Sequence, residues 1–314
     1  MTDAAKTVLE RWQVRKSKKQ KEAFRQWLCA ELENLGYSPA VEGKGSRNVV
    51  AGDPDSAKLL LTAHYDTCAV LPFPNFITPR NLAAYLIYQL LICIPIFVIP
   101  VALEVGGMLL WDYAVGTDCP AWLAVGTLYA GLLLVLWWML DGPANRHTVN
   151  DNTSGVLTLL EIAAALPEAD RGHTCLVFFD NEEKGLLGSQ KFVSMHKAAK
   201  KNALTVNFDC VSDGDFLQLY PEKRTKKDAE AMAALEAAFQ SRGEKTVEVV
   251  RGFGFYPSDN KLFARGVGVC ALKKKPLIGY YMDRIHTGRD TVLEEENILL
   301  LRDGALRLAE SLNG

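Results

Sequence analysis

The sequence has few cysteines, little net charge and no apolar stretch near its start. Seven cysteines in 314 residues exclude a disulfide-stabilised scaffold and suit a reducing compartment. The 35 basic and 37 acidic side chains leave a net charge of −2, whereas nucleic-acid-binding domains carry a strong basic excess. We therefore expect no nucleic-acid partner. Residues 1–35 are charged throughout and lack the apolar core of a secretory signal, so they predict no export.

Two long segments, residues 82–103 and 121–140, contain no charged side chain at all. Each is long enough to cross a bilayer, which takes about 20 apolar residues. Their connection, 104–120, carries three acidic residues and no basic one, while Arg80 precedes the first segment and Arg146 follows the second. The positive-inside rule then predicts a transmembrane hairpin whose flanking domain faces the cytoplasm, with membrane lipid contacting residues 82–140.

A hydrophobic lid or an oligomer interface is the alternative to a membrane hairpin. Pro95 and Pro100 interrupt the first segment, which weakens a plain helix. Two uncharged segments are nevertheless hard to cover within a chain of this length, so the membrane interpretation is favoured. Near the start, the KSKKQK run at 16–21 either contacts anionic lipid or forms a solvated helix face, and a run this short favours the solvated face.

The remaining sequence predicts one α/β domain. Setting aside residues 68–147 as an insertion leaves 1–67, with a helical segment at 1–35, and 148–314. Strands are expected at 47–51, 58–63, 174–179, 203–208, 267–272 and 278–281. Helices are expected at 153–166, 186–199, 226–241 and 293–312. This alternation predicts a mostly parallel or mixed central sheet flanked by helices, from which the helical hairpin extends.

Five short segments at strand ends or helix starts concentrate potential metal ligands. They are AHYDT, NDNTSG, DNEEKGLLGS, NFDC and RIHTGRDT, which carry His64 and Asp66, Asp151, Glu182 and Glu183, Asp209, and His286 and Asp290. Each segment alone is typical of a capped helix or a solvated turn. Together, in this order and at these element ends, they predict a metal centre.

The chemistry of these side chains favours two metal ions. His64 is a nitrogen ligand whose second ring nitrogen Asp66 is placed to hold. Asp151 can bridge two cations. Two adjacent glutamates at the end of an extended strand must point in different directions, so that one ligates metal and the other faces the water. Two metals activate a water and polarise a carbonyl, and a free carboxylate transfers the proton.

The order HxD, D-N-x-x-S-G, E-E-x-G-L-x-G-S, D and H-T-x-x-D-T resembles the co-catalytic zinc aminopeptidase family. That family includes leucine-type aminopeptidases, glutamate carboxypeptidases, glutaminyl cyclases and the transferrin receptor. The resemblance runs from about Asn48 to the C-terminus without the insertion, and the SDNKLF segment at 258–263 is similar to the family's S-D-H-x-x-F. It implies the zinc-aminopeptidase fold.

The resemblance also implies the ligand set. His64 and Asp209 would hold one zinc, Glu183 and His286 the other, and Asp151 would bridge them. Co²⁺ and Mn²⁺ are possible substitutes.

The resemblance assigns the remaining roles too. Glu182 would be the general base and then the acid, and Asp66 and Asp290 would support the ligands. Tyr256 is a candidate for stabilising the oxyanion, although a packing role is as well supported.

The leading functional hypothesis is a membrane-attached zinc aminopeptidase that removes N-terminal residues from peptides. The alternatives are an amidohydrolase of N-acyl or lipidic amides, a glutaminyl cyclase, which generally uses one zinc, and a non-catalytic membrane receptor or scaffold. A homo-oligomer is possible. The insertion separates His64 from Asp151, and this departs from the family's short link.

Overall fold

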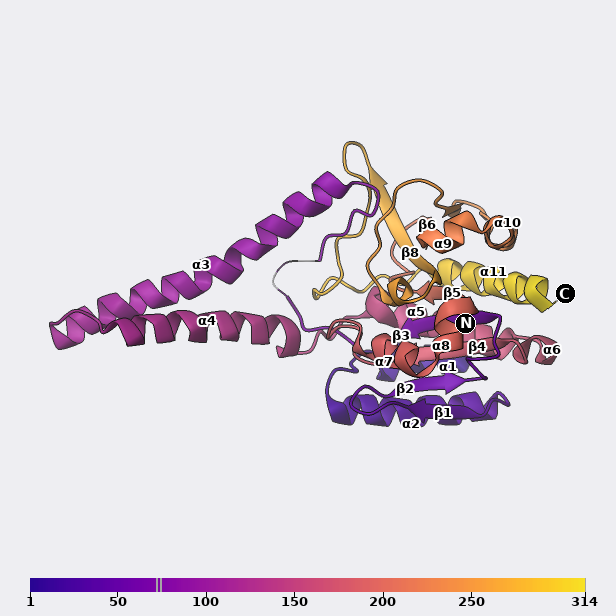
Figure 1. Cartoon of the computed structure of the whole chain (residues 1–314), viewed down its shortest axis with the longest axis horizontal. Coiled ribbons are helices and arrows are strands. Elements are labelled where there is room, and N and C mark those ends of the chain that lie inside the picture. Colours follow the sequence, from indigo (N-terminus) through magenta and orange to yellow (C-terminus); the bar gives the residue numbers. More distant parts are fainter. Residues whose placement is uncertain (72, 74, 314) are drawn as a thin grey trace.

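A mixed sheet forms the centre of the protein (Figure 1). The structure is a computed structural model that describes residues 1–71, 73 and 75–313. The strand order is β1-β2-β4-β3-β5-β8-β6-β7, and β9 pairs with β8. The strands are β1 Pro39–Glu42, β2 Asn48–Ala51, β3 Leu59–His64, β4 Thr174–Phe179, β5 Leu204–Phe208, β6 Phe216–Pro221, β7 Thr246–Val249, β8 Arg265–Lys275 and β9 Gly279–Tyr281. Strands β4, β3, β5 and β8 are parallel to their neighbours in this run, and antiparallel strands flank them. The predicted α/β class with a mixed sheet is confirmed.

The central strands are buried on both faces. In β3, Leu59 and Leu61 pack into the larger hydrophobic core, whereas Leu60 between them packs into a second core on the opposite face. All six residues of β3 and of β4 are buried. This explains why both strands read in the sequence as continuous apolar runs without alternation.

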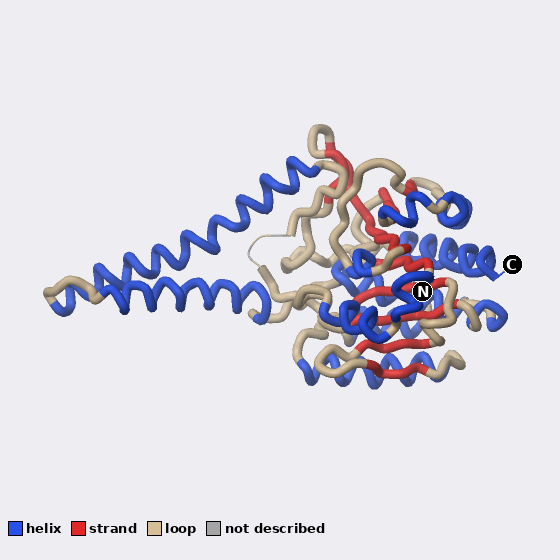
Figure 2. Tube along the Cα trace, viewed as in Figure 1, coloured by secondary structure: helices blue, strands red, loops and turns tan. Residues whose placement is uncertain are grey.

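Helices cover both faces of the sheet (Figure 2). Buried residues of α1, α2, α5, α10 and α11 join the larger core, and those of α7 and α8 join the second. The helices are α1 Asp3–Arg11, α2 Lys18–Asn34, α3 Leu82–Val115, α4 Ala121–Asp141, α5 Ser154–Ala165, α6 Glu168–Arg171, α7 Leu187–Met195, α8 Lys197–Asn202, α9 Lys223–Lys227, α10 Ala229–Ala238 and α11 Glu295–Asn313.

Two expected helices are each divided in two. The helix expected at 186–199 is interrupted at His196, between α7 and α8. The helix expected at 226–241 is interrupted at Asp228, whose side chain accepts a hydrogen bond from the Ala231 N–H and so begins α10 as an N-cap. Strands β1 and β7 were not expected, because each has four residues and is partly exposed. Strand β6 was not expected either, because Gln218 interrupts its apolar residues, although the strand is largely buried.

The two uncharged segments form a helical hairpin that projects from the sheet domain (Figure 1). The first helix is longer than expected, because it continues past residue 103 and ends at Gly116, which adopts a left-handed conformation. Pro95 and Pro100 lie inside it without ending it. A Cβ on Gly131 of α4 would lie 2.9 Å from the Cα of Pro100, so the two helices approach closely there.

The hairpin helices are apolar and largely uncovered. In their most apolar windows only 6% of α3 and 17% of α4 are buried, which distinguishes both from the core helices of a soluble domain. At about 1.5 Å per residue, α4 is about 32 Å long, close to the hydrocarbon thickness of a bilayer, and α3 is longer. By length and composition, both helices are able to cross a membrane.

Candidate metal centre

The five predicted ligands meet at one edge of the sheet. His64 is the last residue of β3, Asp209 directly follows β5, and Glu183 lies in the turn after β4. Because these strands are parallel, their carboxyl ends share this edge. Asp151 lies just before α5, and His286 lies in the loop after β9. They line a cavity of about 150 Å³ together with Glu182 and Tyr256.

The ligand atoms form two groups that share Asp151. The His64 Nε2 atom lies 3.5 Å from Asp151 Oδ1 and 3.5 Å from Asp209 Oδ1. The His286 Nε2 atom lies 3.1 Å from Asp151 Oδ2 and 3.5 Å from Glu183 Oε2. Asp151 therefore presents one carboxylate oxygen to each group.

These separations fit zinc. Zinc binds nitrogen and oxygen donors at about 2.0–2.2 Å, so two donors on one tetrahedral ion lie about 3.4 Å apart. Glu183 adds a further sign, because its buried Oε1 atom has no hydrogen-bond partner among the described residues. The donor set is imidazole and carboxylate, which zinc accepts. The residues present therefore fit bound metal, and Asp151 would offer one carboxylate oxygen to each donor group.

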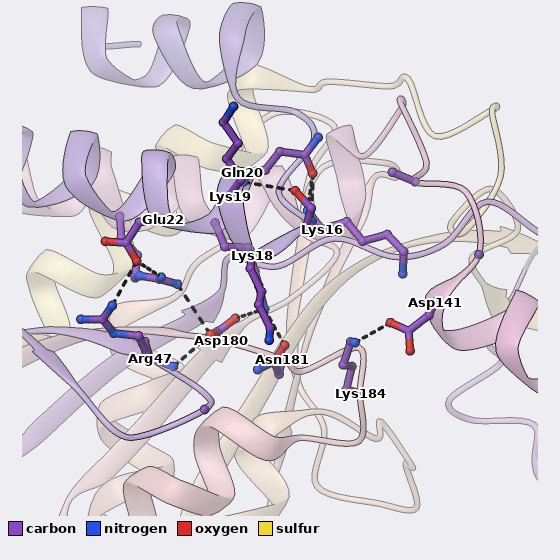
Figure 3. Close-up of a pocket in the computed structure, with 16 residues that line it drawn as sticks. Lys16, Lys18, Lys19, Gln20, Glu22, Arg47, Asp141, Asp180, Asn181 and Lys184 are labelled. Carbon is purple, nitrogen blue, oxygen red and sulfur yellow. Dashed lines mark hydrogen bonds and ion pairs between the residues drawn. The ribbon is translucent and has the colours of Figure 1, made fainter.

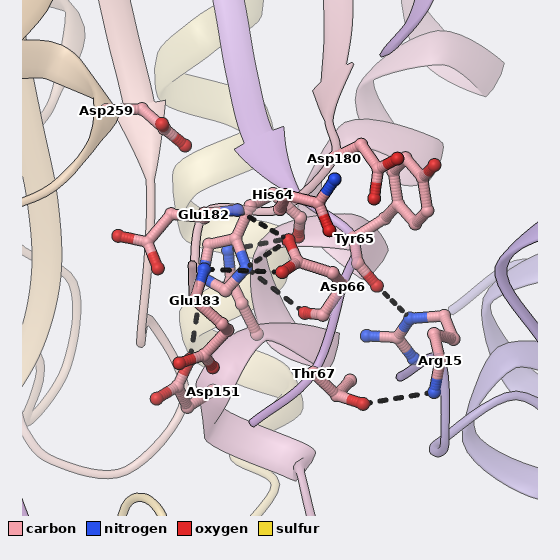
Figure 4. A network of polar contacts seen from close by, with 12 residues as sticks. Arg15, His64, Tyr65, Asp66, Thr67, Asp151, Asp180, Glu182, Glu183 and Asp259 are labelled. Carbon is pink, nitrogen blue, oxygen red and sulfur yellow. Dashed lines mark hydrogen bonds and ion pairs between the residues drawn. The ribbon is translucent and has the colours of Figure 1, made fainter. Parts of the chain in front are cut away.

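Asp66 fixes the turn that carries the two glutamates. Its carboxylate accepts hydrogen bonds from the backbone N–H groups of Glu182, at 2.9 Å, and Glu183, at 3.2 Å. Figure 4 shows the two glutamate side chains leaving this turn in different directions. Divergence was expected from strand geometry, but strand β4 ends at Phe179 and a turn separates the two side chains instead.

Asp66 also lies beside the ring of His64, as expected. The His64 Nδ1 atom is 3.2 Å from the backbone oxygen of Asp66 and 3.5 Å from its carboxylate. The backbone oxygen is thus the nearer partner of this ring nitrogen. Holding Nδ1 leaves Nε2 directed at Asp151 and Asp209.

Burial and crowded carboxylates shift the titration of the centre. Burial lowers the pKa of His286, but Glu183 and Asp151 outweigh this effect and raise it to about 9. Burial, only partly offset by His286, raises the pKa of Glu183 to about 8. Burial and the carboxylates of Asp259 and Asp209 raise the pKa of Glu182 well above its usual range. Carboxylates crowded together in this way are stabilised when a metal cation binds between them.

Asp290 and Ser258 form hydrogen bonds that orient two of the ligands. The Asp290 carboxylate accepts from the backbone N–H groups of Asn150, at 2.7 Å, and Asp151, at 3.0 Å. The Ser258 hydroxyl donates to Asp209 Oδ2 at 2.6 Å and itself accepts from the side chain of Asn207. Asp290 thus hydrogen-bonds the backbone that carries Asp151, and the SDNKLF segment contributes Ser258.

Tyr256 is in the expected place with its hydroxyl engaged. The side chain is buried and lines the same cavity as Glu182 and the ligands. Its hydroxyl donates to the backbone oxygen of Asp209 at 2.9 Å. A role at an oxyanion would require this bond to break, so that role stays a prediction.

Four residues near the centre were not singled out from the sequence. Cys68 and Cys210 lie close enough to the ligands to be metal donors by distance, but burial raises the pKa of both thiols, which disfavours the thiolate that binds metal. Asp259 is fully buried, which raises its pKa to about 7. Arg15 is fully buried beneath the site and donates to Thr153 and to the backbone oxygen of Tyr65.

A larger hollow lies elsewhere in the described part of the chain. It measures about 920 Å³ and lies between the start of α2 and the end of α4 (Figure 3). Its cations include Lys21, which pairs with Asp180, and Lys184, which pairs with Asp141. None of the predicted metal ligands lines it, so we do not regard it as the catalytic cavity.

Solved structures with the same fold match almost the whole chain. Glutaminyl cyclase from Porphyromonas gingivalis is 20% identical with a TM-score of 0.61, covering 99% of this chain and 98% of that one. The LapA aminopeptidase from Legionella pneumophila is 15% identical with a TM-score of 0.57, covering 99% and 71%. A Zn-dependent exopeptidase from Parabacteroides distasonis is 15% identical with a TM-score of 0.59, covering 98% and 94%. A search of curated proteins gave no match.

A family model identifies the chain from its sequence. Peptidase family M28 matches residues 139–302, more than half of the chain. The matched region contains the bridging Asp151, both glutamates, Asp209 and His286, which the structure brings together around one cavity. The chain therefore belongs to peptidase family M28.

Proposed function

We propose that the protein is a dizinc aminopeptidase that removes N-terminal amino acids from peptides at a membrane-attached site. The observation that carries this proposal is the position of Asp151, whose two oxygens face His64 and His286 separately. A shared carboxylate between two donor groups supports two metals rather than one. This favours hydrolysis over glutaminyl cyclisation, which generally uses one zinc.

Glu182 is the residue we assign to proton transfer. It lines the cavity beside the ligands, and among the described residues it forms no ion pair with either histidine, unlike Glu183. Two zinc ions would polarise the scissile carbonyl and activate a water. The Glu182 carboxylate would then take a proton at its free oxygen and return it to the leaving amine. Buried surroundings suit this exchange, because they keep competing water away.

The hairpin supports attachment to a membrane. Its helices expose apolar side chains along their length, including Leu90 and Leu110. The 920 Å³ hollow, which is lined by several lysines, lies where α4 returns to the sheet domain. Two of these lysines, Lys18 and Lys19, have no ion-pair partner within the described part of the chain. Basic groups at this level suit the anionic surface of a cytoplasmic leaflet. We therefore assign the catalytic domain to the cytoplasmic side.

The chemical proposal is tested with purified, zinc-loaded protein in detergent. We expect two zinc ions per chain by elemental analysis, and release of free amino acids from aminoacyl anilides and short peptides. One zinc per chain together with pyroglutamate formation from N-terminal glutamine would instead establish the cyclase. Absence of turnover on both substrate types in the two-zinc protein would favour a receptor or scaffold.

Attachment is tested separately by fractionation. We expect the full chain to sediment with membranes and to remain there after carbonate and high-salt washes. A monodisperse protein in buffer without detergent would overturn the transmembrane hairpin. The hairpin would then be a lid or an oligomer interface.

A further inference from the structure

A second cavity joins the metal centre to the base of the hairpin. It measures about 240 Å³, and its walls include the metal ligands Glu183 and His286. It shares these two residues and Asn75 with the catalytic cavity, so the two spaces adjoin. We name it the hairpin cavity.

The walls of the hairpin cavity are mainly apolar and come from the insertion. Ile92 is contributed by α3, Met139 and Leu140 by the last turn of α4, and Leu71 and Phe73 by the segment leading to α3. Among the described residues of this lining, Glu183 and His286 are the only titratable side chains, and both belong to the metal centre. A charged substrate group would therefore find no counter-ion here except at the metal centre.

Backbone hydrogen bonds attach these walls to the loop that carries His286. The Leu71 N–H donates to the backbone oxygen of His286 at 2.7 Å, and the Asn75 N–H donates to that of Ile285 at 3.2 Å. The Val70 N–H donates to the backbone oxygen of Pro143 at 2.8 Å, which joins the two ends of the hairpin. The cavity is thus held in a fixed position relative to a metal ligand.

One polar side chain of the hairpin helices lines this cavity. Gln89 is the only amide side chain among residues 82–103, and it faces this cavity. Polar groups are costly on a membrane helix and mark functional positions. An amide at this place can hydrogen-bond the polar backbone of a substrate whose apolar chain lies beyond it.

We propose that the hairpin cavity binds a long apolar chain of the substrate while the attached amide reaches the metal centre. Cavities of about 150 Å³ accommodate a benzene-sized group, so this one has room for a longer chain. The preferred substrates are then amphiphilic amides that carry a long apolar chain either on the N-terminal amino acid or on the leaving amine. This inference rests on the proposed hydrolase activity and specifies its substrate class.

The test measures chain-length dependence for protein in lipid nanodiscs. Two substrate series are used: leucine n-alkylamides, with the chain on the leaving amine, and 2-aminoalkanoyl anilides, with the chain on the amino acid. Each buried methylene is worth up to about fourfold in kcat/KM. We expect kcat/KM to rise with chain length in at least one series for the native protein.

Ile92→Trp fills the cavity and serves as the diagnostic variant. We expect it to lower kcat/KM at least tenfold for the longest substrates and to change the shortest less than twofold. Leu90→Trp is the matched control, because Leu90 is on the same helix, is 71% exposed and does not line the cavity. If Ile92→Trp fails to fold, Ile92→Ala replaces it and should shift the preference toward bulkier chains.

Photolabelling gives a readout that does not depend on turnover. Metal-free protein is labelled with a fatty amide that carries a diazirine on its chain, and we expect adducts on Ile92 or Met139. Equal labelling by a diazirine phosphatidylcholine would assign the cavity to bilayer lipid and overturn the proposal. The same chain-length dependence in Ile92→Trp and native protein would also overturn it. A native two-zinc protein that hydrolyses no amide of any length would instead refute the proposed function itself.

Discussion

The backbone N–H of Glu183 donates a hydrogen bond to the carboxylate of Asp66 at 3.2 Å. The neighbouring N–H of Glu182 donates to the other oxygen of the same carboxylate. This double contact fixes the turn after β4, so that Glu183 faces His286 while Glu182 forms no ion pair with a histidine in the described chain. Two adjacent residues of the same type therefore have different surroundings, and substitution should separate their functions.

We predict that Glu182→Gln leaves zinc binding nearly intact and removes most turnover. A positioned acid–base group contributes about 10²–10⁴-fold, and glutamine cannot carry the proton. Glu183→Gln should instead lose metal from one of the two sites, because it replaces a ligand oxygen beside His286. Zinc content and kcat measured on both variants check this. Loss of zinc with retained activity in Glu182→Gln would show that the two roles are exchanged.

The ligand types were predictable from the sequence because strand ends and helix starts can be recognised locally. His64, Asp209 and Glu183 each follow an apolar strand, and parallel strands bring such positions to one edge. The reason for the divergence of Glu182 and Glu183 was not predictable, since it depends on a hydrogen bond to Asp66, more than a hundred residues away.

Other features also depend on contacts distant in sequence. Arg15 reads as one charge in a basic stretch, yet it is fully buried against Tyr65 and Thr153. The positions of Ser258 and Asp259 beneath the ligands follow from the approach of their segment to β5. The limits of the insertion at 68 and 147 remain a prediction. The structure adds that Ile77 pairs with Met282, so part of the segment 68–147 packs against the loop that carries His286.

We predict that Ser258→Ala weakens zinc binding at the site of His64 and Asp209. The Ser258 hydroxyl donates to Asp209 Oδ2 at 2.6 Å and directs the other oxygen toward His64. Loss of such a supporting hydrogen bond costs about 10–100-fold in metal affinity. Competition with a chelator of known affinity measures the change.

The control for this variant is Ser194→Ala, because the Ser194 hydroxyl is exposed and, among the described residues, donates only to the backbone oxygen of Lys191. It should leave both zinc affinities unchanged. Equal affinities in Ser258→Ala and native protein would show that Asp209 is oriented by other contacts.

We predict that Arg15→Ala destabilises the whole sheet domain. Burial lowers the pKa of Arg15 to about 10, although Asp66 and Asp151 act against this, so the guanidinium stays charged at neutral pH. Its removal leaves the Tyr65 backbone oxygen and the Thr153 hydroxyl without this partner. A hydrogen bond to a charged group contributes about 1.5–3 kcal/mol, so the loss of these two bonds should cost about 3 kcal/mol or more.

Urea unfolding of metal-free protein in detergent checks this value, with Arg11→Ala as the matched control. Arg11 ends α1 and is exposed, so its removal should change the free energy of unfolding by less than about 0.5 kcal/mol. Similar effects of the two variants would contradict the structural role of Arg15.

Deleting the hairpin should separate membrane attachment from catalysis, provided that the deletion keeps the ends of the insertion that pack against the sheet domain. Replacing 82–141 by a Gly/Ser linker of about 15 residues retains Asn75 and Ile77, which hydrogen-bond the loop carrying His286. This variant should be soluble without detergent and should retain most activity on short aminoacyl anilides.

A longer deletion, from 72 to 143, also removes those hydrogen bonds. Because a displacement of about 1 Å in an active site can cost 10²-fold in rate, the longer deletion should lose far more of the same activity. The two deletions are compared by kcat/KM on one short substrate and by sedimentation. If both lose activity equally, the hairpin helices themselves support the metal centre, whereas equal retention would show that residues 75–81 do not hold the His286 loop in place.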